Sequence, residues 1–126
     1  MIDETRRPLS FDPTSIPWEP AGEDGTRSAT LVGTRDAGSQ FTYAFLIPAQ
    51  VFDAPHSHSA DAHVFVASGE LLLGYGDTFV RSQLRRYPAG SFLWVPAGEN
   101  HFDGAETETV LIGTATGQWS TDYVLP

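Results

Sequence analysis

Short runs of β-branched, aliphatic and aromatic residues, separated by Gly and Pro, follow one another along most of the chain. In no long window do apolar residues recur at the spacing of three or four positions that marks an amphipathic helix. The runs instead predict β-strands at 28–35, 40–48, 62–69, 70–76, 91–96 and 108–115. Many short strands with regular turn signals are typical of an all-β sandwich or barrel.

The beginning of the chain has a different pattern. Residues 1–27 contain several prolines and a turn-forming segment at 21–25, which predicts an irregular N-terminal arm. Residues 28–126 form one barrel domain in this interpretation, closed by a strand within 117–126. The segment 91–96 is apolar at nearly every position, and this favours a strand buried between the two sheets of a jelly roll.

Composition excludes several kinds of chemistry. The 126 residues include no Cys, and all seven basic residues are Arg, so the chain also lacks Lys. Disulfides, thiolate nucleophiles, cysteine-based metal sites and side-chain Schiff bases are therefore excluded. Catalysis would depend on His, Asp, Glu, Ser, Thr, Tyr or a bound metal ion.

The formal net charge of −9 disfavours a nucleic-acid partner, whose phosphates require a basic face. No apolar stretch approaches the roughly 18 residues that a membrane helix needs, and the first residues lack an apolar signal core. We therefore expect a cytoplasmic protein that binds a small-molecule substrate, with neither nucleic acid nor membrane as a partner.

Three of the four histidines lie between positions 56 and 63. On a strand, His56 and His58 point to the same face and can present two imidazoles to one ion. A second segment begins at Gly90, turns at 96–98 and reaches His101; a hairpin-like return of this kind can bring His101 beside the first pair. Imidazole nitrogen suits several divalent ions, so the three histidines predict a metal centre.

The two segments resemble the two motifs of the cupin superfamily, whose members are small double-stranded β-helix barrels that hold a metal between their sheets. The resemblance covers residues 40–126 and is nearest to small single-domain cupins of the ChrR type. It implies a jelly-roll barrel and a homodimer. Positions that match the motifs are His56, His58 and Gly69 in the first, and Gly90, Pro96, Gly98 and His101 in the second.

The chain departs from these motifs at three positions. Gln50 stands where the first motif opens with Gly, and Ala105 stands where the second ends with Asn. The third departure changes the chemistry, because counting six positions back from Gly69 gives Ala62 where the family has a carboxylate ligand.

The motif tolerates a second frame, in which His63 occupies the ligand position instead of Ala62. Adjacent residues on a strand face opposite sides, so only one of the two can face the metal. The uninterrupted frame favours Ala62 in the site and His63 as a packing or surface residue. A bulge near Asp61 would give the alternative, a site of four histidines.

Further residues are candidates for the pocket or for contacts with the ligands. The acids beside the motif histidines could bind the metal or accept an imidazole N–H, although solvated acids are the more common case; they are Asp61, Glu99 and Asp103. Five aromatic residues could line the pocket, although core packing is the more common role; they are Tyr43, Phe45, Phe92, Trp94 and Tyr123.

Three neutral ligands leave the charge of a divalent ion uncompensated, which favours anionic, chelating substrates. The superfamily includes three-histidine iron dioxygenases that cleave carbon–carbon bonds. The resemblance therefore implies a mononuclear non-haem Fe(II) dioxygenase acting on a small enolisable or chelating oxygenated molecule, with Zn, Ni or Mn as alternative ions. Two alternatives stay open: a redox-neutral metal-dependent lyase, isomerase or hydrolase, and a non-catalytic cupin that binds a small ligand.

Overall fold

A computed structural model describes residues 6–125 as two antiparallel five-stranded sheets. The first sheet contains, in spatial order, β1 (Arg27–Gly33), β2 (Gln40–Ile47), β9 (Thr109–Thr116), β4 (Ala62–Ser68) and β7 (Phe92–Val95). The second contains β10 (Thr121–Tyr123), β3 (Val51–His58), β8 (His101–Ala105), β5 (Glu70–Tyr75) and β6 (Arg85–Pro88). The one helical element of the described chain is a 3-10 turn, η1 (Arg81–Gln83).

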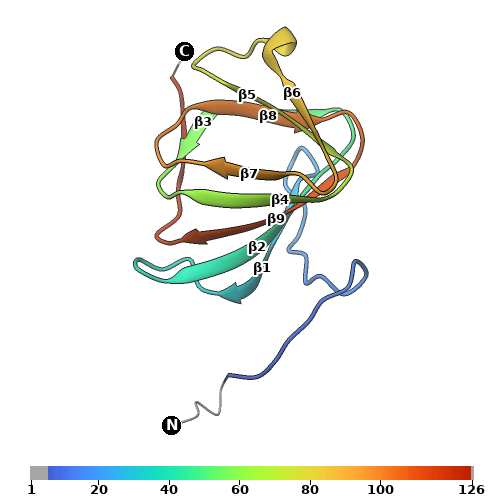
Figure 1. Cartoon of the computed structure of the whole chain (residues 1–126), viewed down its shortest axis with the longest axis vertical. Coiled ribbons are helices and arrows are strands. Elements are labelled where there is room, and N and C mark those ends of the chain that lie inside the picture. The colour runs from blue at the N-terminus through green and yellow to red at the C-terminus, as the bar shows by residue number, and fades with distance from the viewer. Residues whose placement is uncertain (1–5, 126) are drawn as a thin grey trace.

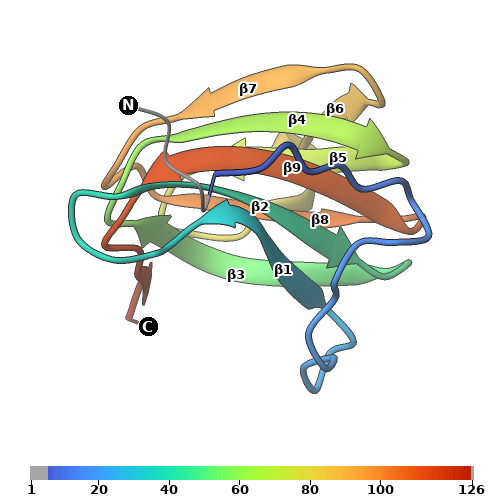
Figure 2. The same cartoon turned by 90° about the horizontal axis from the view of Figure 1, so that it is seen from below.

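The two sheets face each other as layers of a single barrel (Figure 1). Seen from below, β4, β9 and β2 lie side by side although they are far apart in the sequence (Figure 2). The buried core between the layers is mainly aliphatic; it includes Ile47, Val64, Val66, Leu71, Leu73, Leu93, Val95 and Leu111. The predicted all-β, double-stranded β-helix is confirmed, and the chain forms one barrel domain.

The prediction that 91–96 is buried on both faces is wrong. Leu93 and Val95 point into the core, but Phe92 and Trp94 point outward and are 61% and 54% exposed. Phe65 on the neighbouring strand β4 is also exposed. Alternate side chains of a strand point to opposite faces of the sheet, so only one face of β7 can pack into the core, although both faces are apolar.

The connection that leads to His101 also differs from the predicted hairpin-like return. β7 belongs to the first sheet and β8 to the second, so the turn between them carries the chain from one layer to the other. This turn is fixed by the Gly98 N–H, which donates to the His58 carbonyl oxygen at 2.9 Å. His101 therefore reaches the other histidines by crossing between sheets.

Several motif positions have a backbone that favours glycine. Gly69, Gly90 and Gly98 have φ values of 76°, 94° and 76°. Gln50, which replaces the opening glycine of the first motif, keeps the same left-handed conformation with φ 63°. Its N–H donates to the Ala105 carbonyl oxygen at 2.8 Å, so the turn is retained without a glycine.

The N-terminal arm leads away from the barrel toward the lower edge of Figure 1. Residues 6–26 contain no helix or strand, and residues 6–15 are exposed; positions 1–5 of the predicted arm lie outside the described residues. The arm joins the barrel at β1, where the Glu19 N–H donates to the Ser28 carbonyl oxygen at 2.9 Å. Residues 6–125 include no helix that could span a membrane.

Candidate metal centre

Strands β3 and β8 bring three histidines together. His56 and His58 share a face of β3, and His101, the first residue of β8, lies directly opposite His56 in the ladder. One ring nitrogen from each residue lies within 4.8 Å of the others. His56 and His101 are almost fully buried. The structure thus gathers all three predicted ligands into one cluster, and ligation by them remains a prediction.

The imidazoles are oriented by backbone carbonyls. The Nδ1 atom of His56 donates to the Ala54 oxygen at 2.6 Å, and that of His101 donates to the Glu99 oxygen at 2.9 Å. His58 Nδ1 has a longer contact of 3.3 Å with the Ser120 oxygen. A carbonyl oxygen can only accept, so Nδ1 carries the proton and Nε2 keeps its lone pair. This is the arrangement that metal-binding histidines adopt, and the residues fit a divalent ion.

The surroundings also keep two of the imidazoles neutral. Burial, together with the nearby His101 and His56, lowers the pKa of His58 to about 4. Burial is also the main cause that lowers the pKa of His101. A metal binds imidazole only in its neutral form, so both residues are ready to act as ligands at neutral pH.

His58 is further held by the end of the chain. Its ring stacks on Trp119 with centroids 4.3 Å apart and an angle of 22° between the planes. Thr121 on β10 lies opposite His58 in the ladder, with its Oγ1 atom 3.2 Å from His58 Nδ1. The segment 117–123 therefore forms one wall of the site, although it was predicted only as a closing strand.

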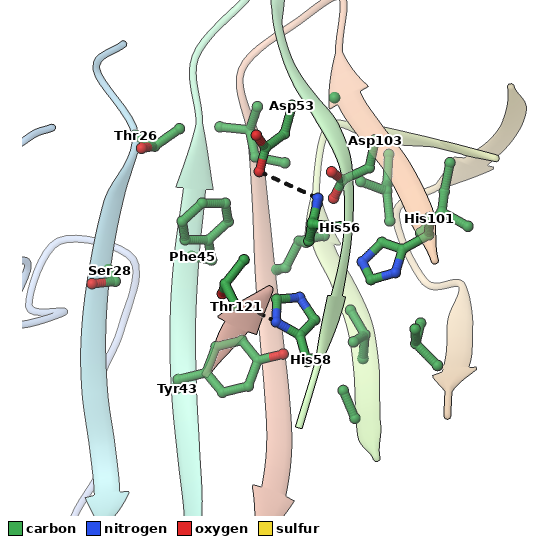
Figure 3. A pocket seen from close by; sticks show the side chains of 18 of the residues that line it. Thr26, Ser28, Tyr43, Phe45, Asp53, His56, His58, His101, Asp103 and Thr121 are labelled. Atoms are coloured by element: carbon green, nitrogen blue, oxygen red, sulfur yellow. Dashed lines mark hydrogen bonds and ion pairs between the residues drawn. The ribbon is translucent and has the colours of Figure 1, made fainter. Parts of the chain in front are cut away.

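Two carboxylates lie beside His56. The register between β3 and β8 shifts between Asp53 and His56, and this bulge places the side chains of Asp53 and His56 on the same side, toward the cavity. Asp53 Oδ2 lies 3.6 Å from His56 Nδ1. The residue Asp53 lies opposite Asp103 in the ladder between β3 and β8. The three residues form a second cluster of metal-ligand type. In Figure 3 both carboxylates point toward the same end of the pocket.

The two acids differ in their exposure to solvent: the Asp53 side chain is 46% exposed, whereas burial dominates the environment of Asp103. Burial is the main cause that raises the pKa of Asp103 to about 6; the nearby His56 opposes this shift and Asp53 adds to it. The Tyr123 hydroxyl donates to both oxygens of Asp53, at 3.0 and 3.1 Å. Burial and Asp53 together raise the pKa of Tyr123 to about 12, so this phenol stays protonated as a donor.

The histidines open into a cavity of about 370 Å³ between the sheets. Aliphatic side chains form much of its lining; they are Ile47, Val51, Ala62, Val64, Leu71, Leu73, Leu93, Val95 and Leu111. Tyr43, Phe45 and Trp119 add aromatic surface. The Tyr43 hydroxyl points toward His58 (Figure 3). A small organic molecule could bind here with one polar end at the histidines and its body against apolar surface.

Strand β4 decides between the two frames of the first motif. Ala62 is 2% exposed and lines the cavity, whereas His63 is exposed on the outer face with its ring 5.9 Å from that of Phe92. His63 therefore does not join the histidine cluster, and the position of the family's carboxylate is occupied by a methyl group.

The other predicted residues divide between cavity and surface. Tyr43, Phe45 and Tyr123 line the cavity, but Phe92 and Trp94 do not, because they project from the outer face. Two of the three acids also lie elsewhere. Asp61 accepts the Ala97 N–H at 2.7 Å and supports the turn after β7, and only the backbone oxygen of Glu99 contacts His101. Asp103 is the predicted acid that lines the cavity.

Sequence reasoning missed Asp53, Trp119 and Arg35, which all line the cavity. The pattern gave a weak signal for Trp119, an aromatic residue near the end of the chain. No sequence signal pointed to Asp53, because residues three positions apart in a regular strand point to opposite faces, and Asp53 was therefore not expected beside His56. Arg35 lies in the loop between β1 and β2, where arginine is usually solvated.

The fold and the histidine cluster define the class: this is a cupin barrel with a candidate metal site. Residues 6–120 match the model of the ChrR cupin-like domain family. The chain therefore belongs to this family, and the resemblance in the two motifs is confirmed. No curated protein matches the sequence.

Solved structures give the same fold at low identity. The polyketide cyclase RemF from Streptomyces resistomycificus has a TM-score of 0.74 and 18% identity, with 95% of this chain and 87% of that chain covered. An RmlC-like cupin from Shewanella frigidimarina has a TM-score of 0.67 and 19% identity, with coverages of 87% and 90%. An oxalate oxidase has a TM-score of 0.65 and 20% identity, with coverages of 92% and 63%. These similarities show the fold.

Proposed function

We propose that the protein is a metal-dependent enzyme that binds a divalent ion through His56, His58 and His101 and acts on a small enolisable or chelating oxygenated molecule. The observation that carries the proposal is the convergence of three imidazoles whose Nδ1 atoms contact carbonyl oxygens, which leaves their Nε2 atoms for a metal. Dioxygenation with Fe(II) is the reaction that we favour.

The donor set supports this substrate class. Three neutral imidazoles leave the ion's charge uncompensated and leave coordination positions for a bidentate anion. A bound divalent ion would supply Lewis acidity, and iron(II) adds the redox chemistry that O2 activation requires. The aliphatic lining would limit bulk water around a reactive substrate, and the Tyr43 hydroxyl can donate to a substrate oxygen near His58.

Oxygen consumption tests the dioxygenase. Protein reconstituted with Fe(II) under anaerobic conditions is mixed with a panel of β-diketones, hydroxy-ketones, keto-acids and catechols, and O2 uptake is followed with an electrode. We expect uptake with at least one member of the panel, and no uptake by the His101→Ala variant. Absence of uptake with every member would contradict the dioxygenase proposal.

A second candidate is a redox-neutral reaction that begins with removal of a proton next to a carbonyl group. The specific observation is the pair of carboxylates, Asp53 and Asp103, in the wall of the same cavity. A carboxylate at this place could accept a proton from a substrate held at the histidines. RemF, a protein of the same fold, is a polyketide cyclase.

Deuterium exchange separates the two reactions. With Zn²⁺-loaded protein in D2O and no oxygen, the redox-neutral candidate predicts exchange at the α-carbon of a ketone substrate, observable by NMR. Exchange should be lost in Asp103→Asn and kept in Asp61→Asn, which changes an acid outside the cavity. Tight ligand binding with neither exchange nor O2 uptake would instead indicate a binding module.

A further inference from the structure

One cationic side chain lines the cavity on the side away from the two carboxylates. Among the described residues Arg35 is the only Arg that lines it. Its guanidinium lies over two rings, 5.1 Å from the centroid of Phe41 and 5.9 Å from that of Tyr43. Tyr43 lies at the opposite end of the pocket from Asp53 and Asp103 (Figure 3). Asp53 and Asp103 therefore lie at one end of the cavity, and the guanidinium of Arg35 lies beside Tyr43 at the other.

Arg35 has no carboxylate partner within residues 6–125. Arg81 and Arg86, by contrast, form ion pairs with glutamates on the surface. The nearest polar contact of Arg35 is a long one, with Nε donating to the Thr30 hydroxyl at 3.4 Å. Most of its donors are thus available to a ligand, and a guanidinium stacked on aromatic rings binds a carboxylate well because it is weakly hydrated and planar.

The loop that carries Arg35 is fixed to the wall of the metal site. The Gly117 N–H donates to the Ser39 oxygen at 2.7 Å, and the Gly38 N–H donates to the Gly117 oxygen at 3.0 Å. A Cβ at Gly117 would clash with the Arg35 carbonyl oxygen, so the two segments are in close contact. Gly117 comes two positions before Trp119, which stacks on His58. The Arg35 loop and the candidate metal centre are therefore built against the same short segment.

One aromatic wall connects the two polar sites. Trp119 is the ring that lies between them, since it stacks on His58 and its centroid is 6.0 Å from that of Phe41, over which Arg35 lies. A ligand that chelates an ion at the histidines and extends along this aromatic wall would bring its far end to the guanidinium.

From this geometry we infer that Arg35 determines substrate specificity by binding a carboxylate at the end of the substrate opposite its chelating oxygens. The inference rests on the proposed function, because it assumes that the other end binds a metal at the histidines. The substrate class becomes a chelating enol, hydroxy-ketone or catechol that carries a distal carboxylate. Asp53 and Asp103 favour the same orientation of the substrate, since they repel its carboxylate from the other end of the cavity.

Two probes that differ in one charge test the inference. They are 3,4-dihydroxybenzoate and its uncharged analogue 3,4-dihydroxybenzamide, which share the same chelating hydroxyls. Binding to Zn²⁺-loaded protein is measured by isothermal titration calorimetry, so that no redox turnover occurs. We expect the acid to bind at least about tenfold more tightly than the amide, a typical effect for a charge-assisted hydrogen bond. A ratio near one in the unmodified protein would overturn the inference without any variant.

The variants assign the effect to one side chain. In Arg35→Gln the ratio should fall to about one while the amide binds as before; Arg35→Lys, which keeps the charge, should restore part of the preference. Arg85→Gln is the matched control, because Arg85 also lies over a ring, 5.3 Å from Tyr87, but outside the cavity. Preference retained in Arg35→Gln would contradict the inference.

The amide reports on the proposed function separately. Its binding should be lost in His101→Ala and unaffected in Arg35→Gln. If the amide binds through the histidines but the acid has no advantage, the specificity role of Arg35 is wrong and the metal-dependent function stands. If neither probe binds Zn²⁺-loaded protein, the chelating site and the role of Arg35 are both wrong.

Discussion

Each imidazole at the candidate metal centre is oriented by the contact of its Nδ1 atom with a carbonyl oxygen, at 2.6 Å for His56, 2.9 Å for His101 and 3.3 Å for His58. The carbonyls belong to the β3 bulge, the turn before β8 and the segment before β10, so three separate parts of the backbone fix one cluster. Loss of any one ring should therefore affect metal affinity far more than loss of a histidine outside the cluster.

The first prediction compares two histidines. His101→Ala removes one of three ligands and should weaken Zn²⁺ binding by more than about 100-fold, because even partners of metal ligands contribute 10- to 100-fold. His63→Ala should bind Zn²⁺ as the unmodified protein does, since His63 lies on the outer face. Competition with a chromophoric chelator measures both affinities. Equal losses in the two variants would disagree with the assigned ligand set.

The second prediction concerns Asp103 and pH. Burial raises the pKa of Asp103 to about 6 in the folded state, so its favourable contribution is present at low pH and is lost as pH rises toward and through 6. Above this pH the charged, weakly solvated carboxylate lowers the free energy of unfolding. Asp103→Asn in metal-free protein should then be more stable than the parent at pH 8, by at most about 3 kcal/mol.

Denaturant unfolding at pH 8 and pH 4 measures this effect. The advantage of Asp103→Asn should shrink or vanish at pH 4, where the parent carboxyl is largely protonated. Asp61→Asn is a suitable comparison, because Asp61 is an exposed acid. A constant difference between Asp103→Asn and the parent at the two pH values would show that the side chain does not titrate as described.

At the scale of single elements, the alternation of β4 decides which residue faces the candidate metal. Ala62 and His63 are neighbours in sequence but lie on opposite faces of the sheet. A carboxylate placed at Ala62 would enter the cavity, whereas one placed at His63 would enter solvent.

The third prediction follows from this alternation. Ala62→Glu should destabilise the metal-free protein by about 2 kcal/mol or more, because it buries an unpaired carboxylate. Zn²⁺ should then raise its melting temperature more than it raises that of the parent, since the carboxylate gains an ion to bind. His63→Glu should show neither effect. Equal responses of the two variants to Zn²⁺ in thermal denaturation would argue against the position of Ala62 beside the metal.

The residues of the centre could be predicted where strand geometry is regular. Period-two alternation places His56 and His58 together, and the spacing of the second motif identifies His101. Asp53 could not be predicted, because the β3 bulge reverses the face that its spacing implies. Phe92 and Trp94 were assigned wrongly to the cavity or core because an apolar strand does not reveal which face is covered.

Strands, like single residues, could be predicted only where the sequence pattern was regular. Apolar runs predicted the strands that form the first sheet and β5, but β3, β6 and β8 contain many polar or charged residues and have no such signal. The motifs supplied what periodicity could not, since they fixed the turns and hence the barrel. Arg35 became a candidate only once the structure placed its loop against Trp119.

At the scale of the whole molecule, an uncharged aromatic surface contrasts with the net charge of −9. Outward positions of β4 and β7 carry His63, Phe65, Ala67, Phe92 and Trp94, with no Asp, Glu or Arg among them. Large exposed apolar patches mark interaction sites. Two acidic chains repel each other except where such a neutral face is available, so we expect the implied homodimer to form through it.

The fourth prediction tests this dimer. Trp94→Glu puts a charge on this surface, beside His63 of the neighbouring strand, and should convert a dimer into a monomer, as measured by light scattering coupled to size-exclusion chromatography. Val32→Glu, an exposed apolar residue at the opposite edge of the same sheet, should leave the mass unchanged. A monomeric parent protein, or a Trp94→Glu variant that stays dimeric, would contradict the assignment.

The molecule as a whole is a barrel with an aliphatic core, and its cavity carries the histidine cluster, the carboxylate pair and Arg35 among its polar lining residues. The account depends on a metal at the first of these. Its most direct test is the metal content of the unmodified protein, purified without added metal and then stripped and reloaded under anaerobic conditions. We predict a divalent ion, most often iron, bound in an equimolar amount to the chain after reloading. Protein that is metal-free as purified and takes up no Fe(II), Zn²⁺, Ni²⁺ or Mn²⁺ would contradict it.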